Sequence, residues 1–202
     1  MANEISQHMA QPPDAVVYPA RKDRRWLWAA LLLLIVLALA LVTALSLSYQ
    51  ARLPGLVTYP NQQHGEAAGP ISYAQSPPAG GKYSPQWQNC GIYNAPVPNE
   101  SAVHSLARGA VWITYRLDLS ISDMAAIQRL ARDRTYMLVS PYPDQQTPIV
   151  ATAWGAQLPL DDPLDNRLTI FLARYRQSAQ APEAGQPCTG GTGAPQRPQG
   201  VH

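Results

Sequence analysis

An uncharged stretch of 22 residues near the start of the chain constrains its fold and location more than any other feature. It runs from Trp26 to Leu47 and reads WLWAALLLLIVLALALVTALSL. As an α-helix rising about 1.5 Å per residue it would be roughly 33 Å long, enough to cross a bilayer core of about 30 Å. Trp28 and Tyr49 add aromatic rings of the kind that favour the headgroup level. The stretch predicts a transmembrane helix over residues 26–48.

The charges on either side of this stretch predict its orientation. Four cations lie just before it, at positions 21, 22, 24 and 25, whereas Arg52 is the only one in the thirty residues that follow. Because cationic flanks stay in the cytoplasm, we expect residues 1–25 to be a disordered, basic-ended cytoplasmic tail and the later chain to be extracytoplasmic. A cleavable signal peptide is the alternative. It is disfavoured because its apolar region is usually about 7–15 residues long, and no clear small-residue cleavage site follows here.

The two cysteines agree with an extracytoplasmic location. Cys90 and Cys188 are far apart in sequence, and an even count in an oxidising compartment predicts one disulfide. A soft-metal site is the alternative, but it would need further cysteine or histidine residues close to them in sequence. The remaining composition is nearly neutral, with 11 Lys and Arg against 10 Asp and Glu in residues 50–202. This balance provides no basic face for nucleic acid, which we do not expect as a partner.

Proline and glycine divide the rest of the chain. We expect a linker over residues 49–60, a folded domain over residues 61–176, and a flexible Pro/Gly-rich tail over residues 177–202. The first part of the domain carries repeated turn signals and predicts a long irregular lead-in. Its later part shows the alternating and helical periodicities of regular structure.

These periodicities predict the order strand, helix, strand, strand, helix. Alternation from Val111 to Leu117 indicates a strand, and Ser120 is a good N-cap for the helix that follows. The two further strands are expected at Thr135–Ser140 and Pro148–Trp154, with Gly155 as a bulge or bend. The last helix begins near Asp162–Pro163 or Asp165. This order predicts a small α+β domain after the transmembrane helix.

Several short motifs repeat the pattern of a known family. The matching segments are Gln63-His64-Gly65, Ser76-Pro77-Pro78, Tyr83 with Trp87, Gly91-Ile92-Tyr93, Pro96-Val97-Pro98, His104-Ser105-Leu106, Gly109-Ala110-Val111, Ser140-Pro141-Tyr142-Pro143 and Thr152-Ala153-Trp154-Gly155. In order and spacing they resemble the bacterial membrane-anchored domain of unknown function catalogued as DUF3105. The resemblance covers roughly residues 60–176. It implies a single-pass protein with an extracytoplasmic α+β domain and no established activity.

The resemblance also draws attention to histidine. Members of the family carry four histidines, two of them in a His-x-Leu-Glu-His-Gly motif, and such a set could hold a transition metal. This chain keeps His64 and His104, but has Ala107 and Arg108 where the motif has Glu-His, and Lys82 in the region of another family histidine. It is therefore a divergent member that lacks part of the motif. A metal bound by His64 and His104 is an alternative to a site that holds no cofactor.

The remaining residues indicate binding rather than catalysis. Tyr83, Trp87 and Tyr93 belong to a set of aromatics that could form a binding surface or pack in a small core. Ser105 lies beside His104, but adjacent side chains point in different directions, so no catalytic residue is expected. We therefore expect a non-enzymatic, membrane-anchored binding or accessory protein, such as a small subunit of a membrane complex. Its expected partners are the lipid bilayer and another membrane or envelope protein.

Overall fold

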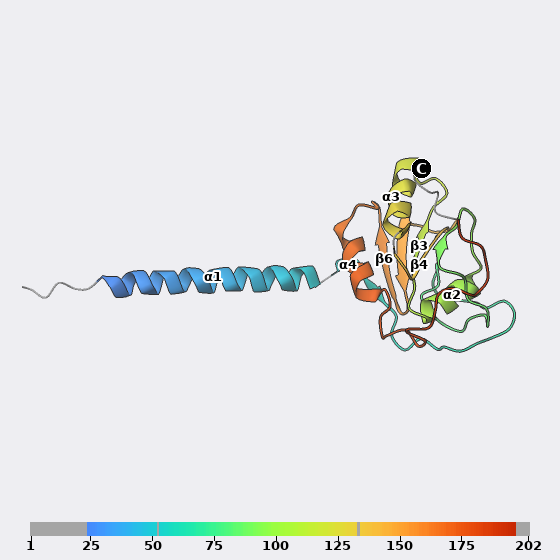
Figure 1. Ribbon diagram of the computed structural model, residues 1–202, viewed down its shortest axis with the longest axis horizontal. Helices are drawn as coiled ribbons and strands as arrows, with labels where there is room; N and C mark the ends of the chain where they lie inside the picture. The colour runs from blue at the N-terminus through green and yellow to red at the C-terminus, as the bar shows by residue number, and fades with distance from the viewer. Residues whose placement is uncertain (1–23, 52, 133, 197–202) are drawn as a thin grey trace, which may run out of the picture. The chain divides into compact units, whose positions relative to one another are not determined.

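The computed structural model describes residues 24–51, 53–132 and 134–196 of the chain. Two compact units are distinguished, one up to Tyr49 and one from Gln50 onward. α1 spans Arg25–Ala51, and its segment Arg25–Leu45, which lies within the first unit, is long and apolar enough to cross a membrane (Figure 1). The expected cytoplasmic tail lies outside the described residues, apart from positions 24 and 25.

The second unit is built on a mixed sheet. Its described strands lie in the order β1-β6-β5-β3-β4-β2, and their bounds are β1 Val57–Thr58, β2 Gly91–Ile92, β3 Val111–Tyr115, β4 Met137–Pro141, β5 Ile149–Ala153 and β6 Ala156–Leu160 (Figure 1). β4 is parallel to both β2 and β3, whereas β5 is antiparallel to both β3 and β6. The mixed α+β class predicted from the sequence is therefore confirmed.

Helices cover both faces of this sheet. α3 (Ile121–Arg132) and α4 (Asn166–Tyr175) pack on one face, where Phe171 and Ile127 meet alternate residues of β3. α2 (Asn99–Ala107) packs on the other face, where Leu106 contacts Trp112 in a second core cluster. The alternation expected in β3 is what allows this strand to contribute to both cores.

The expected helices and strands around β3 and α3 are present within a few residues. Ser120 caps α3, because its Oγ accepts a hydrogen bond from the Asp123 amide at 3.1 Å. Asp165 caps α4 in the same way at the Arg167 amide, so this helix begins at the later of the two expected positions. Gly155, with a φ of 70°, lies in the turn between β5 and β6 and is not a bulge.

Four elements of the domain were not expected from the sequence: β1, β2, α2 and β6. α2 lies within the predicted irregular lead-in, and β6 was missed because Pro159 is unusual inside a strand. β1 pairs with β6 only at Ala156 and Gln157. Pro159 therefore lies where β6 forms the edge of the sheet, a position that tolerates proline.

The predicted flexible tail is, as far as residue 196, part of the domain. Residues 177–196, which we call the C-terminal strap, run alongside residues 87–92. The amide of Thr192 donates to the carbonyl of Trp87, and the amide of Gln196 donates to the carbonyl of Ile92, both at 2.8 Å. A Cβ on Gly191 would overlap the carbonyl oxygen of Trp87. The glycines of the strap thus permit close packing, and the domain extends beyond Arg176; residues 197–202 lie outside the described residues.

Candidate functional site

His104 is the centre of a buried polar cluster. It lies on α2 and its side chain is almost fully buried. Its Nδ1 is 2.7 Å from the carbonyl oxygen of Ser84, so Nδ1 carries a proton and donates it. Its Nε2 lies 3.1 Å from Oε2 of Glu183 and 3.3 Å from Nε of Arg108. Both ring nitrogens therefore have protein partners.

Glu183 brings a carboxylate from the strap to this histidine. Its Oε1 accepts a hydrogen bond from the hydroxyl of Tyr83 at 2.6 Å, and its Oε2 lies 3.5 Å from Nε of Arg108. Partial burial opposes ionisation of Glu183, but the hydrogen bonds from Tyr83 and His104 and the charge of Arg108 outweigh it and lower the pKa of Glu183. Burial, strengthened by the same hydrogen bond, raises the pKa of Tyr83. The tyrosine therefore stays a donor and the glutamate stays an anion at neutral pH.

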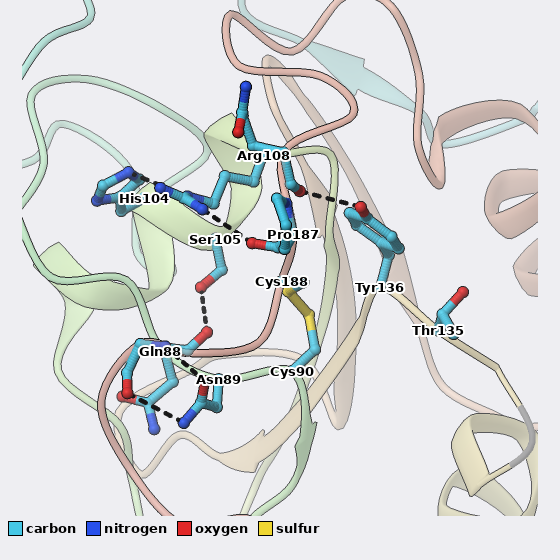
Figure 2. Close-up of a disulfide and its surroundings, with 12 residues drawn as sticks. Gln88, Asn89, Cys90, His104, Ser105, Arg108, Thr135, Tyr136, Pro187 and Cys188 are labelled. Carbon is cyan, nitrogen blue, oxygen red and sulfur yellow. Dashed lines mark hydrogen bonds between the residues drawn. A yellow bond between two sulfur atoms is a disulfide. The ribbon is translucent and has the colours of Figure 1, made fainter.

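Arg108 connects the cluster to the rest of the strap. Its guanidinium carbon lies 3.4 Å from the ring centroid of Trp87, a cation–π contact. One of its terminal nitrogens donates to the carbonyl of Pro187 at 2.9 Å, and Figure 2 shows this bond next to the disulfide. Each charged group of the cluster is thus engaged by another group of the protein. The cluster holds the strap against α2.

The disulfide predicted from the cysteine count is present. Cys90 and Cys188 are bonded, with a Cα–Cα distance of 5.4 Å, and the amide of Cys90 donates to the carbonyl of Cys188 (Figure 2). The bond joins the residues before β2 to the strap. It lies only one residue from Pro187, the partner of Arg108.

The disulfide forms part of the wall of a large cleft. This cleft has a volume of about 920 Å³ and lies between the strap, the start of β4 and the C-terminal end of α3. Ile92, Met137 and the disulfide contribute to its lining, and Thr135 and Thr189 are exposed residues that also line it. Figure 2 shows the disulfide and Thr135. A cleft of this size falls in the range of small-molecule and peptide sites. The strap, and with it the cluster, determines the shape of one wall.

The structure gives no support to the predicted metal pair. His64 is exposed in the lead-in, and among the described residues no group of three His, Cys, Asp or Glu side chains could hold a metal ion. At His104 a metal would have to displace Arg108 and Glu183 from Nε2 or Ser84 from Nδ1. The guanidinium beside Nε2 would in addition repel a metal cation.

The aromatic surface suggested by the sequence is not formed. Tyr83 and Tyr93 are buried, at 3% and 8% exposure, and Trp87 is half-buried beneath the guanidinium of Arg108. Tyr83 and Trp87 both contact the ring of His104, whereas Tyr93 belongs to the core cluster around Trp112. Tyr83 and Tyr93 therefore pack inside the domain, and Trp87 packs against His104 and Arg108.

Ser105 is not paired with a base. Its hydroxyl donates to the carbonyl of Gln88 at 2.6 Å and does not reach the ring of His104 (Figure 2). The serine and the histidine therefore fix two different segments against α2. The arrangement differs from the nucleophile–base hydrogen bond that acyl transfer requires.

Fold and cluster together define the class of protein: an apolar N-terminal helix followed by a mixed α+β domain closed by a disulfide-bonded strap. The model of a family described as a protein of unknown function, DUF3105, matches residues 64–190, more than half of the chain. The chain therefore belongs to the DUF3105 family. No curated protein and no solved structure matches it. The family match continues into the strap, in agreement with its place in the domain.

Glu183 and the cleft were not found by sequence reasoning. Both involve the strap, and its Pro/Gly-rich composition predicts a flexible tail rather than part of the domain. One signal was available: Cys188 lies in the same segment, and a disulfide to Cys90 requires that segment to lie on the domain. Arg108 stands out in the sequence as a replacement for a family histidine, but no local pattern indicates its contact with Glu183.

Proposed function

We propose that this protein is a single-pass membrane protein whose extracytoplasmic domain is a non-catalytic binding module, with the ligand held in the disulfide-walled cleft. α1 is the retained anchor rather than a cleaved signal sequence, and the N-terminus is cytoplasmic. The excess of cations before the apolar run supports this orientation. The disulfide supports an oxidising compartment for the domain.

The cleft of about 920 Å³ is the observation that carries the proposal. A disulfide, a cation–π contact and hydrogen bonds from α2 all fix the strap that forms one of its walls. The polar side chains around His104 are bonded to one another. A cavity whose wall is fixed in this way is suited to holding a ligand.

The test places bulky side chains in the cleft and measures whether the protein still retains a bound ligand. Thr135→Trp and Thr189→Trp place a bulky ring at exposed positions of the cleft, and Gln146→Trp adds the same ring at an exposed position that does not line it. The full chain is extracted from native membranes in mild detergent and analysed by native mass spectrometry. We expect a bound species with the unchanged chain and with Gln146→Trp, and its loss with the two cleft variants. A bound species common to all four, or none with the unchanged chain, contradicts the proposal.

A further inference from the structure

Three large aliphatic side chains of the domain are strongly exposed at one end of the sheet. Leu117, Ile121 and Leu164 are 67%, 83% and 77% exposed. The register aligns Tyr115 of β3 with Ile149 of β5 and Leu160 of β6, so these strands reach the same edge. Leu117 and Ile121 follow β3, and Leu164 follows β6. All three therefore lie beyond the same edge, which we call the apolar edge.

The apolar edge continues into a groove. α3 and α4 pack on the same face of the sheet and both begin at this edge. Between them lies a groove of about 450 Å³, to which α3 contributes Ala126 and Leu130 and the segment before α4 contributes Pro163 and Leu164. Isolated exposed leucines are common on protein surfaces. Leu164 lines this groove, and Leu117 and Ile121 are exposed at the same edge of the sheet; several large exposed aliphatic side chains at one edge are of the kind that marks a contact site.

The charges around this surface are mostly negative. The connections at this edge and the first turns of α3 and α4 hold six carboxylates and two guanidinium groups: Asp118, Asp123, Asp144, Asp161, Asp162 and Asp165, with Arg116 and Arg167. Both guanidinium groups are paired locally, Arg116 with Asp118 at 2.8 Å and Arg167 with Asp165 at 2.6 Å. The carboxylates therefore keep an excess of four negative charges. The whole sequence, in contrast, has a net charge of +2.

The exposed aliphatic side chains and the carboxylates around them together indicate the chemistry of a partner. Apolar side chains surrounded by carboxylates are complementary to an apolar segment flanked by Lys and Arg. They are not complementary to an anionic bilayer surface, which attracts cationic rather than acidic protein surfaces. Arg129 and Arg134 also line the groove, so that across the edge and the groove together the six carboxylates exceed the guanidinium groups by two.

The chain enters the domain beside the same edge. The carbonyl of Pro54 accepts a hydrogen bond from Arg167 at 2.8 Å, and Arg167 lies in the first turn of α4. A partner on the apolar edge would thus lie beside the segment that follows the apolar helix in sequence.

We infer that the apolar edge docks a second protein through an apolar segment with cationic flanks. The three exposed aliphatic residues lie at the ends of β3, β6 and α3 that are opposite to the cleft, although Arg134 lines both the cleft and the groove. The inference goes beyond the proposed ligand site and does not need it.

The experiment installs the photo-crosslinking residue p-benzoylphenylalanine in the full chain in its native membranes. The probe replaces Ile121 or Leu164 in turn, and Ala184, exposed on the strap, serves as the control position. We expect a discrete protein adduct from the two edge positions and none of the same mass from Ala184. Mass spectrometry of the adduct should map the contact to a segment with a Lys and Arg excess.

A charge variant decides between this partner and other sources of an adduct. Asp161→Asn with Asp162→Asn keeps the shape, and the new amide at position 162 retains an acceptor for the Leu164 amide that Asp162 now bonds at 2.8 Å. We expect the adduct to fall at least about fivefold, as two lost charge contacts imply. An adduct that is unchanged, formed with lipid, or absent overturns the inference. The cleft variants Thr135→Trp and Thr189→Trp should leave the adduct unchanged, so failure of the proposed function would be recognised separately.

Discussion

Nε2 of His104 lies 3.1 Å from Oε2 of Glu183, although 79 residues separate the two in sequence. The contact joins α2 to the C-terminal strap and is reinforced by Tyr83 and Arg108. In the motif that the sequence resembles, a glutamate would stand at the position of Ala107, in the same helix as His104. Here the carboxylate beside His104 is that of Glu183, which lies on the strap. The contact between them therefore helps to hold the strap on the domain.

Removing the carboxylate should weaken the attachment of the strap. Glu183→Gln leaves the buried ring of His104 and the hydroxyl of Tyr83 with a neutral partner, at a cost of about 1–3 kcal/mol in the free energy of unfolding. Denaturant unfolding of the detergent-solubilised chain measures this cost. Gln186→Ala, a change at an exposed position of the strap, is the matched control and should alter stability much less. Equal losses for both variants would contradict the role of the carboxylate.

The same carboxylate predicts an acid dependence of stability. Because the pKa of Glu183 is lowered in the folded protein, its stabilising contribution is fully present above the unfolded pKa of about 4.3 and is lost as pH falls through the lower folded value. Stability of the unchanged chain should therefore decrease more steeply below about pH 4 than stability of Glu183→Gln. Parallel curves of unfolding free energy against pH would contradict the lowered pKa.

The disulfide should contribute strongly to the folded state. It closes a loop across a separation of 98 residues, for which the chain-entropy model gives about 4–5 kcal/mol. Cys90→Ser with Cys188→Ser should lower the midpoint of thermal unfolding by about 10 °C or more. Added reductant should lower the midpoint of the unchanged chain and leave that of the double variant unaltered. A midpoint insensitive to both changes would show that the strap is held without the bond.

The glycines of the strap should be intolerant of a methyl group. Gly191→Ala would drive a Cβ into the backbone of Trp87 and should cost about 1–3 kcal/mol of stability through overpacking. Thr189→Ala, an exposed change two residues away, is the control and should alter stability by less than about 0.5 kcal/mol. If Gly191→Ala unfolds at the same denaturant concentration as the unchanged chain, the close packing of the strap is refuted.

Periodicity predicted the centre of the domain well. Alternation in β3 and helical spacing in α3 and α4 follow directly from burying one face of each element, and Ser120 caps α3 as its residue type suggests. The outer strands of the sheet were not predicted. β1 and β2 have two residues each and therefore no measurable period, and Pro159 hides β6.

The site was obscured by composition. Pro/Gly-rich sequence usually indicates flexibility, because glycine costs more entropy to order than other residues. In the strap the same residue is required by close approach to residues 87–91, a relation between distant segments that no local pattern encodes. Because the strap was predicted to be a flexible tail, Glu183 was not predicted to be a site residue. The aromatics near His104 were recognised, but whether they lie on the surface or in the core depends on packing that composition does not reveal.

Metal binding provides a further test of the cluster. Because both ring nitrogens of His104 have protein partners and Arg108 lies 3.3 Å from Nε2, we expect no stoichiometric metal in protein produced in medium supplemented with zinc, copper and iron. His104→Ala should lower stability and leave the metal content of the protein unchanged. Elemental analysis that found one equivalent of metal, lost in His104→Ala, would instead support the metal pair with His64.

The most direct test of a retained anchor with an extracytoplasmic domain is labelling of intact cells with a membrane-impermeant maleimide. The two cysteines of the chain are joined in the disulfide, so single added thiols report their own location. Ser6→Cys reports the N-terminal tail and Gln146→Cys an exposed position of the domain. We predict labelling of Gln146→Cys only, on a protein whose intact mass still includes residues 26–48. Labelling of Ser6→Cys instead, or a mature N-terminus beyond Leu47, would contradict the account.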